Sequence, residues 1–416
     1  MLKKFAKIIV VTISWRIVKK LLVKKDIKIV AVVGSVGKSS TKRAIAQVLA
    51  KKYRVAWQDG NYNDIVSVPL VFFGLTMPSL FNPLAWIRIF IEMNTRVANY
   101  SKDVVVLELG TDSPGQIAQF SKYLQVDIAV VTPIAPEHME FFASLEEVAK
   151  EELTIQDFAK EIIVFEQTRI VFDDDVVPNA KTYGCLDTST SFVDFEGDIA
   201  VIKTDKMFYE FKPAVIGLHQ VINLSAACLV AEMLDLDKDL IVRGLASIRP
   251  MPGRMQKLKG IKDCIIIDDT YNSSPASVEA ALDTIAQIKV SGKKIAVLGN
   301  MNELGDSAKE LHLQIGTLCT PKLLDLLVTI GAEANKYLAG QAEKNGCKVI
   351  RSNSPYEIGE ILLEEITQDS LILLKGSQNG VFLEEAIKPI LASQADRKKL
   401  VRQSRTWIKK KQEFFA

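Results

Sequence analysis

The fold is decided by the stretch Ile29-Val30-Ala31-Val32-Val33-Gly34-Ser35-Val36-Gly37-Lys38-Ser39-Ser40-Thr41. An apolar, β-branched run of strand length meets a tight glycine turn, and a helical pattern follows from Ser40 to about Leu49. In a strand, loop and helix of this kind, backbone N–H groups and the positive end of the helix dipole face the loop. The sequence therefore predicts a loop that binds phosphate.

The loop is a shortened form of a known nucleotide-binding pattern. The strict P-loop has four residues between its first glycine and the Gly-Lys pair, whereas only Ser35 and Val36 separate Gly34 from Gly37 here. Lys38 supplies a charge for the outer phosphates, and Ser39 supplies a hydroxyl for a magnesium ion. The alternative is an ordinary glycine turn before a helix. The residues predicted to contact phosphate are Gly34, Ser35, Val36, Gly37, Lys38, Ser39 and Ser40.

Bulk composition excludes several classes of protein. A length of 416 residues suggests two or three domains, and 48% hydrophobic residues suffice for full cores. The net charge of +2 gives no global signature of nucleic-acid binding. Five scattered cysteines without a CxxC motif argue against a zinc ribbon or a disulfide framework, and for a reducing compartment. No apolar run reaches the roughly 20 residues of a membrane span, and no cleavable signal is evident.

Both ends of the chain are basic and carry aromatic residues. Residues 1–25 contain eight Lys or Arg residues and no acidic residue, and the tail of residues 396–416 contains Trp407. Apolar residues in the first segment follow helical spacing: Ile8, Val11, Trp15, Val18 and Leu22. This pattern is typical of a helix at a membrane surface, or of a helix packed on the protein's own body with its lysines in solvent. Residues 78–98 predict a second interfacial helix or a buried one.

The remaining pattern alternates strands and helices. Val104–Leu107 is an apolar strand that ends at Glu108, and Ile128–Val131 is another, followed by His138. This alternation predicts a doubly wound, mostly parallel sheet, whose ligands lie beyond the carboxyl ends of its strands. We therefore expect the glycine loop, Glu108 and His138 to converge in space. A hinge at residues 250–254 precedes a second α/β unit. The predicted divisions are 1–25, 26–250, 251–395 and 396–416.

Nine short motifs occur in order along the chain. They are Gly34–Ser40, Gly60–Asn63, Glu108–Gly110, Pro136–His138, Gly217–Asn223, Gly253-Arg254, Asp268–Pro275, Leu298–Gly305 and Lys375–Ser377. In this order they resemble the ATP-dependent Mur ligases, and most closely the MurF-type branch, which adds D-alanyl-D-alanine to a muramoyl peptide. The resemblance covers residues 28 to 390.

The resemblance implies a fold, an activity and partners. The fold is α/β: a P-loop central ATPase domain with a mostly parallel sheet, plus a C-terminal Rossmann-like α/β domain. The activity is an ADP-forming carboxylate–amine ligation with ATP and Mg²⁺, in which a carboxylate becomes an acyl phosphate and an amine then forms the amide. The partners are a small-molecule or lipid-linked peptide and an amino acid or dipeptide, without nucleic acid. The location is the cytoplasm, at the inner membrane surface if the basic ends contact it.

The resemblance also assigns roles to residues. Lys38 holds the β- and γ-phosphates, Ser39 and Glu108 bind one magnesium, and His138 binds a second. His219 and Asn223 face the adenine. Arg254 reaches the γ-phosphate from across the hinge, and Asp269 reaches the ribose. The expected substrate residues are Asn61, Asn63, Tyr271, Asn272, Lys375 and Ser377, although ordinary turn chemistry also accounts for the segment around Asn272.

Three departures limit the transfer of these roles. Because the P-loop begins at Gly34, we expect the family's N-terminal domain for the UDP-sugar to be absent. The usual carbamylated lysine is replaced by Glu152, which we expect to serve as a metal ligand or lysine substitute; the alternative is a surface charge in the run Glu146–Glu152. Asn300 and Gln378 replace an expected aspartate and arginine. The expected catalytic residues are Lys38, Glu108, His138, Glu152 and Arg254.

Two other functions stay open at this point. One is a related ligase that extends another polymer, such as a poly-glutamate, cyanophycin-like or pseudomurein peptide. The other is a nucleotide-binding scaffold without turnover, which the departures at Glu152, Asn300 and Gln378 keep under consideration.

Overall fold

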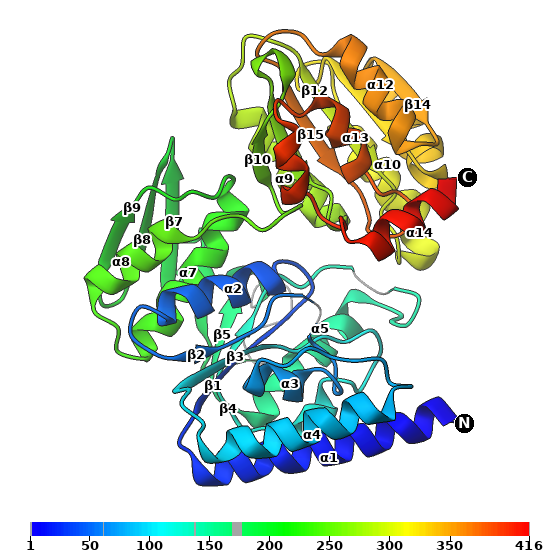
Figure 1. Ribbon diagram of the computed structural model, residues 1–416. Helices are drawn as coiled ribbons and strands as arrows, with labels where there is room; N and C mark the ends of the chain where they lie inside the picture. Colours follow the sequence, from blue (N-terminus) through cyan, green and yellow to red (C-terminus); the bar gives the residue numbers. More distant parts are fainter. Residues whose placement is uncertain (1, 61, 137–138, 169–176, 416) are drawn as a thin grey trace. The chain divides into compact units, whose positions relative to one another are not determined.

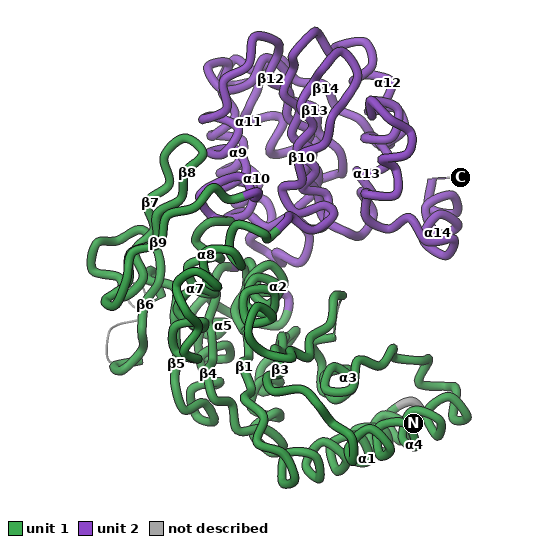
Figure 2. The backbone as a smooth tube through the Cα atoms, turned by 60° about the vertical axis from the view of Figure 1, so that its left-hand side comes forward, with its two compact units in different colours: residues 1–135, 141–213, 220–248 green, residues 136–140, 214–219, 249–416 purple. Residues whose placement is uncertain are grey.

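The chain folds into two compact units. The computed structural model describes residues 2–60, 62–136, 139–168 and 177–415. Figure 2 distinguishes the units by colour. Unit 1 comprises Met1–Ala135, Phe141–Pro213 and Gln220–Ile248, and unit 2 comprises Pro136–Glu140, Ala214–His219 and Arg249–Ala416.

Unit 1 is built on a nine-stranded sheet in the order β2-β3-β1-β4-β5-β6-β7-β8-β9. Neighbouring strands are parallel from β2 to β7, and only β7, β8 and β9 pair antiparallel. The strands are β1 (Lys28–Val33), β2 (Val55–Ala56), β3 (Val104–Glu108), β4 (Val126–Val131), β5 (Ala159–Phe165), β6 (Lys181–Gly184), β7 (Ser191–Glu196), β8 (Ile199–Thr204) and β9 (Phe208–Phe211).

Helices enclose this sheet (Figure 1). They are α1 (Leu2–Lys24), α2 (Lys38–Leu49), α3 (Val68–Phe73), α4 (Pro83–Ala98), α5 (Leu145–Leu153), α7 (Leu218–Met233), which begins in unit 2, and α8 (Lys238–Ser247). The helix expected over residues 144–158 is α only as far as Leu153 and continues as a 3₁₀ helix over Thr154–Phe158.

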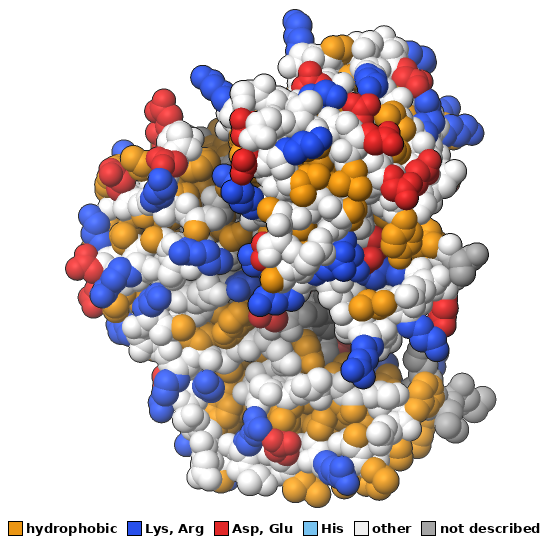
Figure 3. Space-filling view, turned by 45° about the horizontal axis from the view of Figure 1, so that its top comes forward, with side chains coloured by type: hydrophobic (Ala, Val, Ile, Leu, Met, Phe, Trp, Pro, Cys, Tyr) orange, Lys and Arg blue, Asp and Glu red, His pale blue; other side chains and the backbone are white. Residues whose placement is uncertain are grey.

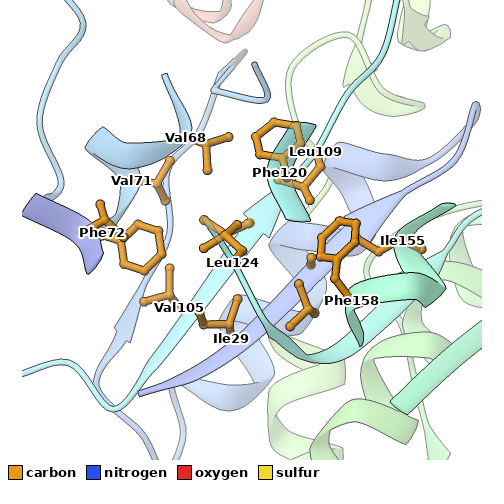
Figure 4. Packing of buried hydrophobic residues seen from close by; sticks show 14 of the residues in the cluster. Ile29, Val68, Val71, Phe72, Val105, Leu109, Phe120, Leu124, Ile155 and Phe158 are labelled. Atoms are coloured by element: carbon orange, nitrogen blue, oxygen red, sulfur yellow. The ribbon is translucent and has the colours of Figure 1, made fainter. Parts of the chain in front are cut away.

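The core of unit 1 lies between the central strands and the covering helices. Strands β1 and β3 are buried almost throughout, as expected for β-branched strands with neighbours on both sides. Figure 4 shows Ile29 and Val105 of these strands packed near Phe72, Leu124 and other large apolar side chains. This packing fixes the carboxyl ends of β1, β3 and β4, where the glycine loop begins.

Unit 2 is a second α/β layer structure. Its six-stranded sheet has the order β10-β11-β15-β12-β13-β14, and only β10 is antiparallel to its neighbour. The elements are β10 (Gln256–Lys259), β11 (Ile265–Asp269), α9 (Pro275–Gln287), β12 (Lys294–Gly299), α10 (Ala308–Leu318), β13 (Leu326–Ile330), α11 (Ala339–Lys344), β14 (Val349–Ser352), α12 (Pro355–Glu365), β15 (Leu371–Lys375), α13 (Glu384–Ile387) and α14 (Arg405–Phe415). The predicted α/β class with mostly parallel sheets is confirmed.

The N-terminal helix packs on unit 1. Trp15 of α1 is 1% exposed, stacks on Tyr123 with ring centroids 4.8 Å apart, and donates from Nε1 to the Ile65 carbonyl at 2.8 Å. Trp15 therefore packs on the protein's own body, as the second of the two expected alternatives predicts for this helix. Ile8, expected on the same face, is 62% exposed. The second half of α1 is part of the core, whereas its first turns present apolar side chains to solvent.

The basic tail belongs to unit 2. Arg402 forms an ion pair with Glu384 at 2.7 Å, and Lys411 forms ion pairs with Glu384 at 3.1 Å and with Glu385. Lys411 is 1% exposed. Two of the tail's cations are thus committed to buried carboxylates of α13. Among the residues that the structure describes, no helix is both long and apolar enough to cross a membrane.

Candidate active site

The glycine loop follows β1 and precedes α2, as the sequence predicts. Gly34 has a φ of +114°, and a Cβ built on it would lie 2.4 Å from Thr132 Oγ1 and 2.5 Å from the Thr132 carbonyl oxygen. Only glycine fits this backbone conformation and this close approach. The N–H groups of Ser35 and Val36 donate to the Pro133 carbonyl at 3.1 and 3.0 Å. The loop is therefore tied to the segment that follows β4, and the first turn of α2 faces its mouth.

Asn223 lies against the junction of loop and helix. Gly37 is the N-cap of α2 with a φ of +90°, and a Cβ there would lie 2.9 Å from Asn223 Oδ1. The same oxygen accepts a hydrogen bond from Thr41 Oγ1 at 3.2 Å. Asn223 comes from α7, far along the chain, so the fold brings this predicted nucleotide residue to the loop.

Lys38 stays at the loop. Its ammonium group donates to the carbonyl of Ser35 at 3.1 Å and to that of Gly34. The charge therefore lies over the turn where phosphate is expected.

Glu108 at the end of β3 connects to α2 through two side chains. Its Oε2 accepts a hydrogen bond from Ser39 Oγ at 2.9 Å and forms an ion pair with Lys42 Nζ at 3.0 Å. The side chains of Lys42 and Glu108 are only 4% and 5% exposed. Sequence reasoning missed Lys42, although its position four residues after Lys38 places both lysines on one face of α2.

Glu152 is buried beside the loop. Its side chain is 2% exposed, and Oε2 accepts a hydrogen bond from the Gly34 N–H at 2.8 Å. The alternative of a surface charge is therefore wrong for this residue. Its neighbour Glu151 accepts from the N–H groups of Gly115 at 2.6 Å and Ile117 at 2.7 Å. Thus α5 brings two carboxylates inward, one to the loop after β1 and one to the segment after β3.

Asn63 lies at the end of β3. Its carbonyl accepts from the Gly110 N–H at 2.9 Å, and a Cβ on Gly110 would lie 2.7 Å from Asn63 Nδ2. Asn61 and His138 lie outside the described residues. Within the described part of the chain, no three His, Cys, Asp or Glu side chains gather as a metal site.

In unit 2, Asp269 and Lys375 form a buried pair. The two residues are register partners on the parallel strands β11 and β15, and Lys375 Nζ lies 2.5 Å from Asp269 Oδ2. Lys375 also donates to the Asn272 carbonyl at 3.0 Å, and Asp269 Oδ1 accepts from the Met255 N–H at 3.0 Å. Burial lowers the pKa of Lys375, while Asp269 opposes that shift. The pair ties the loop after β11 to the strand start at Met255.

Arg254 and Tyr271 form a second contact in unit 2. The guanidinium carbon of Arg254 lies 4.2 Å from the centroid of the Tyr271 ring, a cation–π arrangement, and the Tyr271 N–H donates to the Gly253 carbonyl at 3.0 Å. Ser377 Oγ accepts from the Asn302 N–H at 2.9 Å and donates to the Ser273 carbonyl at 3.4 Å. Arg254, Asp269, Tyr271, Asn272, Lys375 and Ser377 therefore gather at the carboxyl ends of β11 and β15.

The two described histidines lie in unit 2, where His312 is buried and His219 is partly buried. Burial lowers the pKa of His219 to about 4, so its ring is neutral at pH 7. His312 Nε2 accepts from the Met301 N–H at 3.1 Å, and its Nδ1 lies 2.7 Å from the Ala308 carbonyl. His312 thus holds the loop after β12. Asn300 Oδ1 in that loop accepts from the Ala334 N–H at 2.9 Å.

Family models match both units. The model described as the Mur ligase middle domain matches residues 32–231, and the model described as the Mur ligase, glutamate ligase domain matches residues 253–378. The UDP-N-acetylmuramoyl-tripeptide–D-alanyl-D-alanine ligase of Bacillus subtilis is 30% identical over 383 residues, which cover 88% of this chain and 76% of that protein. The chain belongs to the Mur ligase family.

Solved structures support the fold of this Mur ligase. MurF from Acinetobacter baumannii aligns with a TM-score of 0.75 at 22% identity, over 92% of this chain and 79% of that chain. MurF from Thermotoga maritima, solved in complex with ADP, aligns with a TM-score of 0.73 at 23% identity, over 91% and 83%. As a Mur ligase, the chain is an ATP-dependent ligase with the predicted α/β architecture.

Proposed function

We propose that this Mur ligase adds D-alanyl-D-alanine to the peptide of a muramoyl acceptor in peptidoglycan synthesis. The observation that carries the proposal is the 30% identity to a ligase of that name across 88% of this chain. The described site supports it, because the glycine loop, a buried acidic strand end and a cationic loop in unit 2 are all present.

The nucleotide proposed for unit 1 is ATP. The mouth of the loop offers the amino-terminal turn of α2 and the ammonium of Lys38, both of which attract phosphate. Asn223 borders the loop at Gly37 and is available to an adenine. These residues orient the γ-phosphate for transfer to a carboxylate, a reaction in which positioning and charge neutralisation dominate.

Magnesium is the cation that fits the acidic side of this site. Ser39, Glu108 and Glu152 offer hard oxygen donors close to the loop, which is the ligand type that Mg²⁺ prefers, and His138 is the fourth proposed ligand. When bound, the ion would neutralise charge on the transferred phosphoryl group. Lys42 compensates the charge of Glu108 in the protein itself.

Glu152 is proposed to replace the carbamylated lysine of the family. Its side chain already ends in a carboxyl group, which is buried beside the loop and accepts a hydrogen bond from the Gly34 N–H. A ligase with this glutamate has no need of carbon dioxide to form the bridging group.

The amine is proposed to bind in unit 2. As the family resemblance implies, Arg254 is proposed to reach the γ-phosphate, His219 to face the adenine and Asp269 to contact the ribose. Asp269 is also the ion-pair partner of Lys375. Tyr271, Asn272, Lys375 and Ser377 line the loop that would receive the dipeptide, and Asn61 and Asn63 would face the acceptor. The proposed functional divisions are 26–250 for the central domain and 251–395 for the C-terminal domain.

We further propose that the acceptor is either a soluble peptide or a lipid-linked one, and that the enzyme works at the cytoplasmic face of an anionic membrane. The basic composition of residues 1–25 supports this location.

A substrate screen tests the proposed reaction. The purified full chain is incubated with ATP, Mg²⁺, muramoyl tripeptides and D-alanyl-D-alanine, and ADP and the amide are measured by mass spectrometry. Formation of both products supports the proposal. Turnover only with another amine or polymer indicates a related ligase, and nucleotide binding without any turnover indicates a scaffold. Lys38→Ala is the matched inactive control.

A further inference from the structure

Helices α1 and α4 lie side by side on one edge of unit 1. Figures 1 and 2 both show them adjacent, they are in contact, and Lys20 Nζ donates to Asn94 Oδ1 at 3.5 Å. Their inner faces enter the core through Trp15, Trp86 and Met93. One side of each helix is therefore fixed by the protein, which leaves the other side to solvent.

The outer side of this helix pair is unusually apolar. Side chains on α1, on α4 and on the turn before α4 expose a large fraction of their surface: Phe5 66%, Ile8 62%, Ile9 42%, Phe81 64%, Leu84 69%, Ile87 52% and Ile91 63%. On α4, residues 84, 87 and 91 follow the spacing of one helical face. Figure 3 shows hydrophobic side chains at the surface at the bottom of the view, where Figure 1 places these helices. A group of exposed apolar side chains of this size marks an interaction site.

The same helices carry a one-sided charge. Residues 2–25 hold no Asp or Glu, and the basic side chains exposed on α1 are Lys4, Lys7, Arg16, Lys19, Lys20 and Lys24. On α4, Arg88 is exposed beside Ile87, and Glu92 pairs with Arg96 at 2.5 Å. Net charge along the pair is therefore positive and is not balanced locally.

We infer that the α1–α4 face, defined by the seven exposed apolar residues and the basic residues around them, docks on an anionic lipid surface. Apolar side chains flanked by Lys and Arg favour the interface between acyl chains and negative headgroups. Neither helix qualifies as a membrane span, so the pair lies on the membrane. A second copy of the same positive face would repel this one, which argues against self-association through it.

This inference specifies which surface makes the membrane contact proposed above. It rests on that part of the proposed function and not on the ligase reaction, because none of the residues of the α1–α4 face belongs to the proposed catalytic set. The expected membrane contact of the C-terminal tail stays a prediction, and this inference concerns the α1–α4 face alone. Arg402 and Lys411 of the tail are committed to carboxylates of unit 2, and the lipid-facing apolar residues of the central domain come from α4.

Vesicle sedimentation of the full chain tests the face. The vesicles contain phosphatidylcholine and phosphatidylglycerol in equal parts, or phosphatidylcholine alone. The parent is expected to sediment with the mixed vesicles and to be released by high salt. Ile87→Glu/Ile91→Glu should weaken binding at least a hundredfold, because each isoleucine that inserts into the membrane is worth about tenfold or more in affinity. Lys4→Glu/Lys7→Glu should weaken it by about thirtyfold or more, because each basic residue near the surface is worth about fivefold.

The matched control is Phe208→Glu, which changes a side chain 49% exposed on β9 of the same unit. It should leave vesicle binding unchanged, and circular dichroism should report the same fold for all variants. The inference is overturned if the parent does not sediment with the mixed vesicles. It is also overturned if Phe208→Glu loses as much vesicle binding as the variants of the α1–α4 face. A parent that is dimeric in solution when Ile87→Glu/Ile91→Glu is monomeric overturns it as well. ADP formation is measured separately without vesicles, so failure of the ligase reaction does not bear on this result.

Discussion

Replacing Lys42 by methionine should destabilise unit 1 in a way that a divalent cation partly reverses. The ammonium of Lys42 lies 3.0 Å from Glu108 Oε2, and both side chains are almost fully buried. With an effective dielectric constant of about 20, the attraction at this distance is roughly 5 kcal/mol. Removing one partner of such a pair leaves an uncompensated buried charge and costs about 3–5 kcal/mol. We expect Lys42→Met to lower the free energy of unfolding by that amount.

Urea unfolding followed by tryptophan fluorescence measures this change. A Trp407→Phe background confines the signal to unit 1, which contains Trp15, Trp57 and Trp86. The matched control, Lys51→Met, removes an exposed lysine just after α2 and should change the free energy of unfolding by less than about 1 kcal/mol.

Two further measurements decide the cause. The double variant Lys42→Met/Glu108→Gln should recover most of the lost free energy, because it removes the unpaired charge. Mg²⁺ with ADP should reduce the deficit of Lys42→Met to less than half, because the cation supplies the missing positive charge beside Glu108. This reasoning would be refuted if the double variant were no more stable than Lys42→Met. It would also be refuted if Mg²⁺ with ADP left the loss in free energy of unfolding unchanged.

Four other predictions follow from the site and from unit 2. Gly34→Ala should weaken ATP binding at least tenfold in calorimetry, because its Cβ would meet Thr132 and its φ is strained by about 1–3 kcal/mol. Glu152→Lys should make ADP formation rise with added bicarbonate, whereas the parent should be indifferent to bicarbonate. Burial raises the pKa of Asp268 to about 6, from a value of about 4 in the unfolded chain. The stability contributed by the protonated carboxyl group is therefore lost as the pH rises from about 4 to 6. Asp268→Asn should raise the free energy of unfolding in urea by about 3 kcal/mol at pH 7 and leave it almost unchanged at pH 4. Arg402→Gln should destabilise unit 2 by about 3–5 kcal/mol, measured by Trp407 fluorescence, whereas Lys409→Gln, in an exposed pair, should cost less than about 1 kcal/mol.

The sequence predicted the fold well because its strongest signals are local. The β-branched runs before Gly34 and Glu108 became β1 and β3, and the helical pattern after Gly37 became α2. Parallel strands place their carboxyl ends together, so the approach of Glu108 to Ser39 followed from topology.

The tertiary contacts of individual side chains could not be predicted from local sequence patterns. Lys42 was missed because a lysine inside a helix is usually solvated, and only the tertiary packing of α2 on β3 buries it. The burial of Trp15 depends on Ile65 and Tyr123, which lie fifty or more positions away along the chain. No rule of local residue spacing predicts such partners. The roles of Asn61 and His138 stay predictions.

The salt bridges of α13 determine how the C-terminal half can be produced. The family match to this half ends at residue 378, before Glu384 and Glu385 and before the cations that neutralise them. A fragment that ends after α13 and Lys388 would keep Lys388 as the counterion of Glu385 but would leave the buried Glu384 without Arg402 and Lys411, and we expect it to aggregate. Isotope labelling or crystallisation of this half alone therefore requires that expression continue through Lys411.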